Sequence, residues 1–286
     1  MLKTGICLAK YGYDVTHPEA MRILKQAGFD SFFTGWTEDD NLKFHSQMAN
    51  EAAKIGMVYE SIHAPFGGIN CIWEDGEEGE AYRKSLRRCV EDAAACGVLY
   101  ITAHIMNVPQ YNTANPPLWS ELGVSRFADI VSYAADKGIK VAFENVEFPQ
   151  YQLHKLIQRL RDIVPQGLGF CWDTGHEHCY PAGSTSVPEL FGDLIIGTHM
   201  HDNFGQANPA IVTWDDDVHI MPFDGTINYH EVGQKLKGIG YTGTVTLEIG
   251  RGERQWNILP WYQHYTFEEF ASQAHEKARR IAILCD

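Results

Sequence analysis

The sequence predicts a single (β/α)8 barrel, an α/β fold, that spans residues 1–286 as one domain. Three observations lead to this prediction. Eight short strand patterns alternate with helical patterns at intervals of roughly 25 to 40 residues. No linker-like stretch divides the chain, and acidic or histidine residues recur where the strand patterns end. The alternative is an open doubly wound sheet, which is disfavoured because no Gly-rich phosphate fingerprint follows the first strand pattern.

The expected strands are short apolar runs in which β-branched and aromatic residues are frequent. They cover Gly5–Ala9, Ser31–Gly35, Val58–Ala64, Tyr100–Ile105, Lys140–Val146, Leu168–Asp173, Ile196–Asp202 and Thr244–Ile249. The sixth run is the most informative, because it passes through a turn at Thr174 and Gly175 into His176. A carboxylate at a strand tip with a histidine three residues later is good material for a metal site.

The expected helices show apolar residues at helical spacing between start and stop signals. Thr16 is placed to cap the first helix, with Pro18 and Glu19 in its first turn, and Gly28 ends it. Later helices are expected at about 42–55, between the loop 67–79 and Gly97, and at about 121–137, 151–163, 187–193, 229–237 and 266–283. Two further loops are expected at 107–119, which is rich in proline, and at 203–228, whose length suggests a functional role.

Composition and charge exclude several classes of function. The net charge of −14 argues against nucleic acid as the main partner, because phosphate binding needs a cationic surface. No apolar run reaches the roughly 20 residues of a membrane span. The apolar part of the N-terminus is too short for a signal peptide, and the seven cysteines are scattered. We therefore expect a cytoplasmic protein with reduced thiols and a small-molecule partner, and a homo-oligomer is left open.

Alternation along the strands places chemically active side chains in the barrel interior. Bulky residues such as Val141 and Phe143, Ile196, or Val245 and Leu247 lie on the outward parity of their strands and should face the helices. Acids and imidazoles share the other parity with small residues, close to the carboxyl ends of six strands. These side chains are His63, His104, Glu144, Asp173, His199 and Glu248.

Four of these side chains predict a metal site. A single buried histidine or a strand-end glutamate is ordinarily structural, but three converging carboxylates without cationic partners need a compensating charge. The four come from consecutive strands and can surround one divalent ion, Mn²⁺, Mg²⁺, Zn²⁺ or Co²⁺. They are Glu144, Asp173, His199 and Glu248. His201 lies one pleat beyond His199 on the same face and is the alternative imidazole ligand. His199 is preferred, with His201 or Asp202 nearby outside the ligand set.

The motifs carrying these residues resemble those of the xylose-isomerase-like TIM-barrel superfamily, which contains sugar phosphate isomerases, epimerases and endonuclease IV. The resembling segments are SIHAPF (61–66), FENV (143–146), WDTGH (172–176), HMHDN (199–203), DDVHIMPFDGTINY (216–229) and GYTGTVTLE (240–248). Likeness to D-tagatose 3-epimerases implies that Glu144 and Glu248 form the catalytic acid/base pair. It also implies one metal ion on the four residues above and a substrate contact at His176.

Further substrate contacts are expected at His63, His104 and His219. The arginine that those epimerases carry shortly after the metal-binding histidine is absent here, where residues 203–206 read NFGQ. Arg251 is the candidate to grip a phosphate or carboxylate instead. Aromatic residues near strand ends, namely Trp36, Phe66 and Trp172, are candidates to wall the substrate.

The resemblance implies a metal-assisted proton transfer through a cis-enediolate, giving either epimerisation or aldose–ketose isomerisation. A dehydratase acting on a keto-inositol would use the same intermediate. Endonuclease IV offers a different alternative, a multi-zinc phosphodiesterase, because its three-zinc site has the same residue types. The matching residues are His63, His104, Glu144, Asp173, His176, His199, Asp217, His219 and Glu248. A barrel that binds sugar without turnover is the third possibility.

Overall fold

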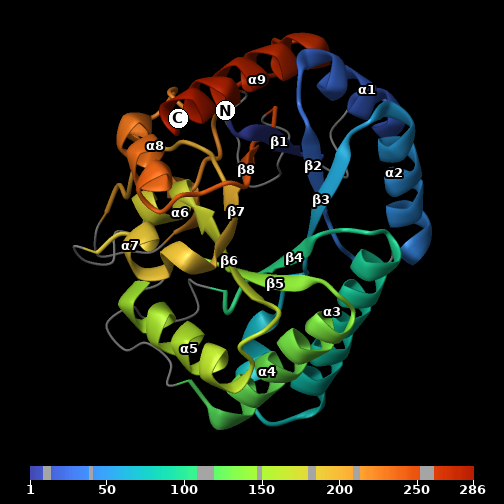
Figure 1. Ribbon diagram of the computed structural model, residues 1–286, viewed down its shortest axis with the longest axis vertical. Coiled ribbons are helices and arrows are strands. Elements are labelled where there is room, and N and C mark those ends of the chain that lie inside the picture. Colours follow the sequence, from blue (N-terminus) through green and yellow to red (C-terminus); the bar gives the residue numbers. More distant parts are fainter. Residues whose placement is uncertain are drawn as a thin grey trace.

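The computed structural model describes residues 1–8, 14–38, 41–107, 119–146, 150–179, 185–208, 213–251 and 261–286. Within these residues, eight parallel strands form a barrel that helices surround (Figure 1). The strand order is β7-β6-β5-β4-β3-β2-β1-β8, and a parallel bridge between Met200 and Leu247 joins the two ends. The sheet is therefore nearly closed, which confirms the predicted barrel over the open sheet.

The strands match the predicted runs to within a few residues. They are β1 (Lys3–Cys7), β2 (Ser31–Gly35), β3 (Val58–His63), β4 (Tyr100–Ala103), β5 (Lys140–Glu144), β6 (Leu168–Asp173), β7 (Ile195–His199) and β8 (Thr244–Leu247). The amino end of Met1 lies 3.0 Å from the Asp286 carboxylate, so both ends of the chain meet on the same side of the barrel.

The helices follow the strands in the predicted alternation, and a short helix lies where a turn was expected at Thr174 and Gly175. They are α1 (His17–Ala27), α2 (Asn41–Ile55), α3 (Glu77–Ala95), α4 (Glu121–Asp136), α5 (Gln150–Ile163), α6 (Thr174–Cys179), α7 (Val187–Phe191), α8 (Tyr229–Gly238) and α9 (Phe267–Leu284). The predicted signals act as expected at α1, where the Thr16 hydroxyl accepts the Glu19 N–H and Gly28 ends the helix at φ 118°. None of the helices in the described ranges is both long and apolar enough to cross a membrane.

Short elements that the sequence did not predict lie in the loops. A 3-10 turn, η1 (Ile69–Trp73), occupies the loop 67–79, and η3 (Trp214–Asp216) lies within 203–228. The buried Asp202 carboxylate orders part of that long segment, since it accepts the N–H groups of Phe223 and Ile227. Most of the predicted loop 107–119 lies outside the described residues.

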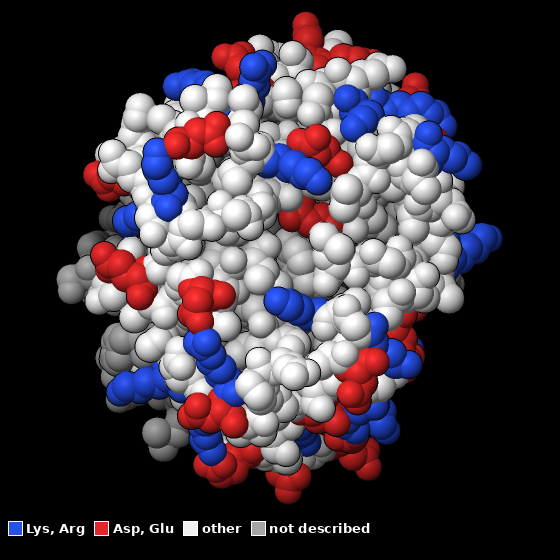
Figure 2. Space-filling view, in the orientation of Figure 1, with Lys and Arg blue, Asp and Glu red and all other residues white. Residues whose placement is uncertain are grey.

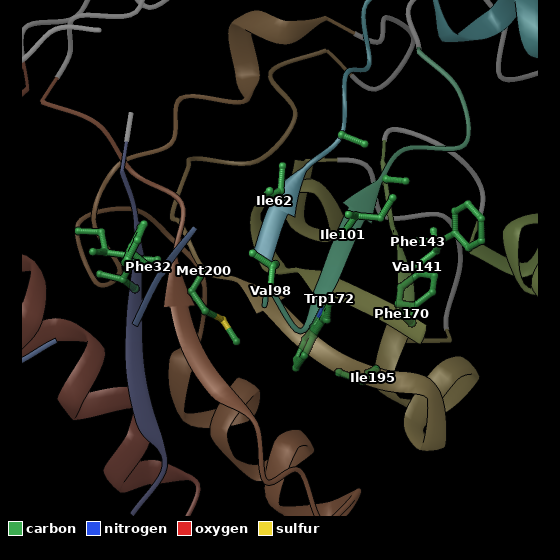
Figure 3. Packing of buried hydrophobic residues seen from close by; sticks show 14 of the residues in the cluster. Phe32, Ile62, Val98, Ile101, Val141, Phe143, Phe170, Trp172, Ile195 and Met200 are labelled. Carbon is green, nitrogen blue, oxygen red and sulfur yellow. The ribbon is translucent and has the colours of Figure 1, made fainter. Parts of the chain in front are cut away.

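The outer faces of the strands carry the hydrophobic core. Val141, Phe143 and Phe170 lie buried between the barrel and its helices, as the alternation predicted (Figure 3). Inward-facing positions on the same strands, such as Ala142, Glu144, Gly169 and Cys171, are small, polar or charged. The parity of β5 thereby separates the packing residue Phe143 from its charged neighbour Glu144.

Two register shifts interrupt the alternation lower in the barrel. Phe170 pairs with Ile195 and Cys171 with Gly197, so Ile196 is an extra residue on β7. We predicted that Ile196 faces the helices, and this was wrong, because it packs with Cys171 and the interior cluster. A similar shift on β3 makes Glu60 the extra residue; its buried carboxylate accepts the hydroxyls of Ser31, Thr246 and Tyr100.

Candidate active site and metal centre

The candidate site lies at the carboxyl ends of the strands, inside the barrel mouth. Six predicted side chains each come from the last residue of a strand or from the residue directly after it. They are His63, His104, Glu144, Asp173, His199 and Glu248. Parallel strands in a barrel end on one rim, so this placement brings residues far apart in sequence to one place.

Glu144, Asp173, His199 and Glu248, which we call the central cluster, offer ligand atoms within 4.8 Å of one another. Nδ1 of His199 lies 2.8 Å from Oε1 of Glu144 and 3.2 Å from Oε2 of Glu248. Oδ1 of Asp173 accepts the backbone N–H of His176 at 2.6 Å. Its other oxygen, Oδ2, is buried without a hydrogen-bond partner among the described residues. Such an arrangement of converging acids is able to hold a divalent cation.

His63 and His104 flank the central cluster on the Glu144 side. Nε2 of each ring lies 3.2 Å from Oε2 of Glu144. The Nδ1–H of His63 donates to the carbonyl of Ala64, so Nε2 carries the lone pair when the ring is neutral. A lone pair facing a carboxylate is unfavourable unless a proton or a cation lies between them.

A second group of ligand-type residues lies next to the first: His176, His201, Asp217 and His219, which we call the second cluster. Oδ2 of Asp217 lies 2.9 Å from Nε2 of His219 and 3.3 Å from Nε2 of His176. The Nδ1–H groups of these two rings donate to the carbonyls of Glu248 and Asn145. Both Nε2 atoms therefore face a carboxylate, as His63 does, and this is the orientation of metal-binding histidines with a carbonyl behind them.

The sequence reasoning read His176 and His219 as substrate contacts. It grouped them with Asp217 only through the likeness to endonuclease IV, and it did not place His201 with them. The available signal was the pair of short spacings, Asp217-x-His219 and His199-x-His201. The backbone of His219 adds to this picture, because its φ of 46° lies in the left-handed region that non-glycine residues seldom adopt. Backbone strain of this kind concentrates at functional sites.

Charges in the two clusters compensate one another when no cation is bound. Burial alone would raise the pKa of Glu144, but the charge of His199 and hydrogen bonds from the surrounding imidazoles hold that pKa well below its usual value. The pKa of Asp217 is likewise well below its usual value despite burial, because His219, His176 and His201 surround it. Burial lowers the pKa of His199, yet nearby negative groups including Glu144 and Glu248 raise it well above the usual value. A divalent cation would replace the protons on these imidazoles.

Aromatic side chains divide between the site and the outer core. Phe66 stacks on His104 with ring centroids 5.0 Å apart and is 42% exposed, so one of the predicted wall residues borders the site. Trp36 and Trp172 instead donate to Asp92 and Glu177 and are buried in the core.

Phe33, which the sequence reasoning missed, stacks on the His199 ring at 4.6 Å. An aromatic residue on the interior parity of β2 was the signal that could have revealed it. The other predicted side chain, Arg251, donates to Asp14 at 2.8 Å. This bond joins the end of β8 to the segment before α1.

Comparisons with known proteins agree with the fold. A family model described as a xylose isomerase-like TIM barrel matches residues 21–269. An uncharacterized protein of Methanocaldococcus jannaschii is 32% identical over 203 residues, which cover 65% of this chain and 63% of that protein. A protein named inosose isomerase from Halalkalibacterium halodurans is 27% identical over 170 residues, 57% of each chain. The matched parts are thus less than two thirds of these two relatives. The solved structure of D-psicose 3-epimerase from Clostridium cellulolyticum superposes over 100% of both chains, with a TM-score of 0.75 and 14% identity.

Proposed function

The chain belongs to the xylose isomerase-like TIM barrel family, and on that premise we propose that it is a divalent-metal-dependent isomerase or epimerase of a sugar or sugar phosphate. The observation that carries the proposal is the central cluster, where three carboxylates and one imidazole converge within 4.8 Å. The names of two similar proteins, an inosose isomerase and a D-psicose 3-epimerase, support the same class of reaction.

The residues of the central cluster fit a divalent ion. The unpartnered Oδ2 of Asp173 and the His199 nitrogen that faces two carboxylates are suitable ligand atoms. We propose that Glu144, Asp173, His199 and Glu248 hold one Mn²⁺, Mg²⁺, Zn²⁺ or Co²⁺, because the set combines oxygens with one imidazole and no thiolate. A bound ion of this kind supplies Lewis acidity, which polarises a substrate carbonyl and lowers the pKa of the adjacent C–H.

Glu248 is the better placed of the two glutamates to remove a proton. Its side chain is 13% exposed, whereas Glu144 is fully buried and surrounded by imidazoles. Glu248 takes the proton from the carbon next to the carbonyl, and the C–H electron pair moves to give a cis-enediolate. Glu144, protonated for this step by one of the imidazoles that face its carboxylate, returns that proton on the opposite face for epimerisation, or to the neighbouring carbon for isomerisation.

The surroundings favour a small polar ring as substrate. His63, His104, His176 and His219 border the two clusters and are the proposed substrate contacts, and the exposed face of Phe66 offers a stacking surface. Arg251 remains the proposed contact for a phosphate or carboxylate, with Asp14 as its present partner. We propose a soluble carbohydrate as the partner of a cytoplasmic enzyme.

Exchange of substrate hydrogen with solvent tests this proposal. Metal-loaded protein is incubated in D₂O with ketoses, ketose phosphates and keto-inositols, and deuterium uptake at carbon is followed by NMR. We expect uptake with at least one of these, and a loss of roughly 10²–10⁴-fold in Glu248→Gln, the usual contribution of a general base. Surface Glu91→Gln is the matched control. If Glu248→Gln exchanges substrate hydrogen as fast as the wild type, Glu248 is not the catalytic base. If the wild type exchanges no substrate of the panel, a protein that binds sugar without turnover is favoured.

The second cluster favours one alternative, a multi-zinc phosphodiesterase. Together with His63 and His104, the two clusters provide ligands for more than one ion. Against it, the net charge is −14, and on the face drawn in Figure 2 Lys and Arg are interspersed with Asp and Glu. Metal analysis separates the candidates: one ion per chain supports the isomerase, and three zinc ions with cleavage of a model phosphodiester support the hydrolase. Loss of water from a keto-inositol would instead identify a dehydratase.

A further inference from the structure

We propose that His201 is a positioning residue whose ring fixes the orientation of Asp173 in the central cluster. The ring fits at this position because Gly175 has no side chain. This inference rests on the proposed function, because it takes Asp173 as a ligand of the divalent ion. His201 lies on the same face of the chain as His199, two residues further along. It is fully buried and stands between the two clusters.

The contacts of His201 reach both clusters. Its Nε2 lies 3.0 Å from Oδ1 of Asp173 and 3.6 Å from Oδ1 of Asp217. These are close contacts without hydrogen-bond geometry among the described residues. The same oxygen of Asp173 accepts the backbone N–H of His176 at 2.6 Å. Oδ1 is therefore enclosed from two sides, and Oδ2 is the oxygen left for an ion. Mutation of an outer residue that orients a ligand in this way typically weakens metal affinity by about 10–100-fold.

Ring stacking argues against His201 as a ligand of the second cluster. Its ring lies on the ring of His219 with centroids 3.6 Å apart and planes inclined by 5°. An imidazole binds a metal ion through a lone pair in the ring plane. An ion midway between two such planes would lie about 1.8 Å out of each, almost the whole length of a Zn–N bond of about 2.0 Å. In this stacked arrangement His219 and His201 cannot both be ligands of one ion, and His219 already faces Asp217.

Gly175 makes this position of His201 possible. A Cβ at residue 175 would lie 1.9 Å from Cε1 of the His201 ring and within 2.4 Å of both of its nitrogens. The backbone of Gly175 does not need positive φ, so conformational freedom does not explain a glycine there. The glycine of the WDTGH motif is explained by the space that His201 occupies above it.

A double-mutant cycle tests the inference. The proteins compared are the wild type, His201→Ala, Gly175→Ala and the double variant, and Co²⁺ affinity is measured by titration of the metal-free full-length chain, followed by visible absorption. We expect His201→Ala to weaken Co²⁺ binding by about 10–100-fold. Gly175→Ala should cause a similar loss, because its methyl group displaces the ring. In the His201→Ala background the methyl group meets no ring, so Gly175→Ala should change the affinity by less than about twofold.

Two further variants separate positioning from general loss of structure. Gly238→Ala is the matched control, since a Cβ there meets no atom within 4 Å, and it should leave Co²⁺ affinity unchanged. His201→Gln keeps an amide N–H near the position of Nε2 and should recover most of the affinity lost in His201→Ala. The inference is overturned if His201→Ala binds Co²⁺ as tightly as the wild type, if His201→Gln recovers nothing, or if the two losses are additive. Failure of the wild type to bind Co²⁺ at all would remove the proposed function as well.

Discussion

Comparison of Phe33→Ala with Phe32→Ala distinguishes an effect on the stability of the barrel from an effect on metal binding at the central cluster. Phe33 is 1% exposed on the interior face of β2, and its ring stacks on His199 at 4.6 Å and 13°. The neighbouring residue Phe32 is 0% exposed on the opposite face and stacks on Tyr59 at 4.7 Å and 14°. The two rings are matched in size, burial and stacking, and only Phe33 touches a residue of the central cluster.

Both variants should lose similar stability. Truncation of a buried phenylalanine to alanine costs about 3–5 kcal/mol in the free energy of unfolding, through lost burial and the cavity left behind. Urea denaturation of the metal-free protein measures this loss. Because the cavity in Phe33→Ala lies against the His199 ring, that variant should also bind Co²⁺ about 10–100-fold more weakly, as expected for loss of a group that orients a ligand. Phe32→Ala should bind Co²⁺ as the wild type does.

Equal Co²⁺ affinities in the two variants would refute the role of Phe33 in supporting His199. If the free energy of unfolding of either variant falls by less than about 1 kcal/mol, the claim that both rings are tightly packed in the core is refuted. Since stability and affinity are measured separately, the two failures are distinguishable.

Two further predictions concern titration and thiol chemistry. The pKa values of Glu144 and Asp217 are held well below 4.5 and 3.8 by surrounding imidazoles, against the effect of burial, so their contribution to stability is present above about pH 4.5 and is lost as the pH falls below that value. The free energy of unfolding of the chelator-treated protein, measured between about pH 6 and pH 3, tests this prediction. A free energy of unfolding that does not change over this pH range would contradict it. Burial raises the pKa of the Cys171 thiol to about 12 and that of Cys89 well above its usual value. Iodoacetamide at about pH 8 should therefore leave both unmodified in the native protein and alkylate both after unfolding, as mass spectrometry would detect; rapid native labelling of Cys171 would contradict the structure.

Local patterns in the sequence were sufficient for the barrel and its family. Parity along a strand depends only on the period of two residues, so Phe143 could be assigned to the core and Glu144 to the interior without any tertiary information. The same logic gathered His63, Asp173 and His199 at one rim, because parallel strands of a barrel end together. The predicted fold and family are both confirmed.

The prediction of inward and outward side chains from alternation was wrong where one strand has an extra residue relative to its neighbour. The register shift at Ile196 turns that side chain into the interior, and nothing in the local pattern of apolar residues distinguishes this bulge from a regular strand. The Asp14 contact of Arg251 is also not visible in a local pattern, because Asp14 lies 237 residues away in the sequence. The proposed anion contact of Arg251 stays a prediction.

What the sequence determined by itself was the order of strands and helices and the residue types offered at the barrel mouth, since both follow from periodicities of the backbone. Only the tertiary structure decided that His176, His201, Asp217 and His219 form the second cluster. Asp217 and His219 lie in a long irregular segment whose path depends on contacts such as those of Asp202, and no repeat encodes that path. The need for glycine at residue 175 is of the same kind, because the ring that fills its space comes from His201, in the segment that follows β7.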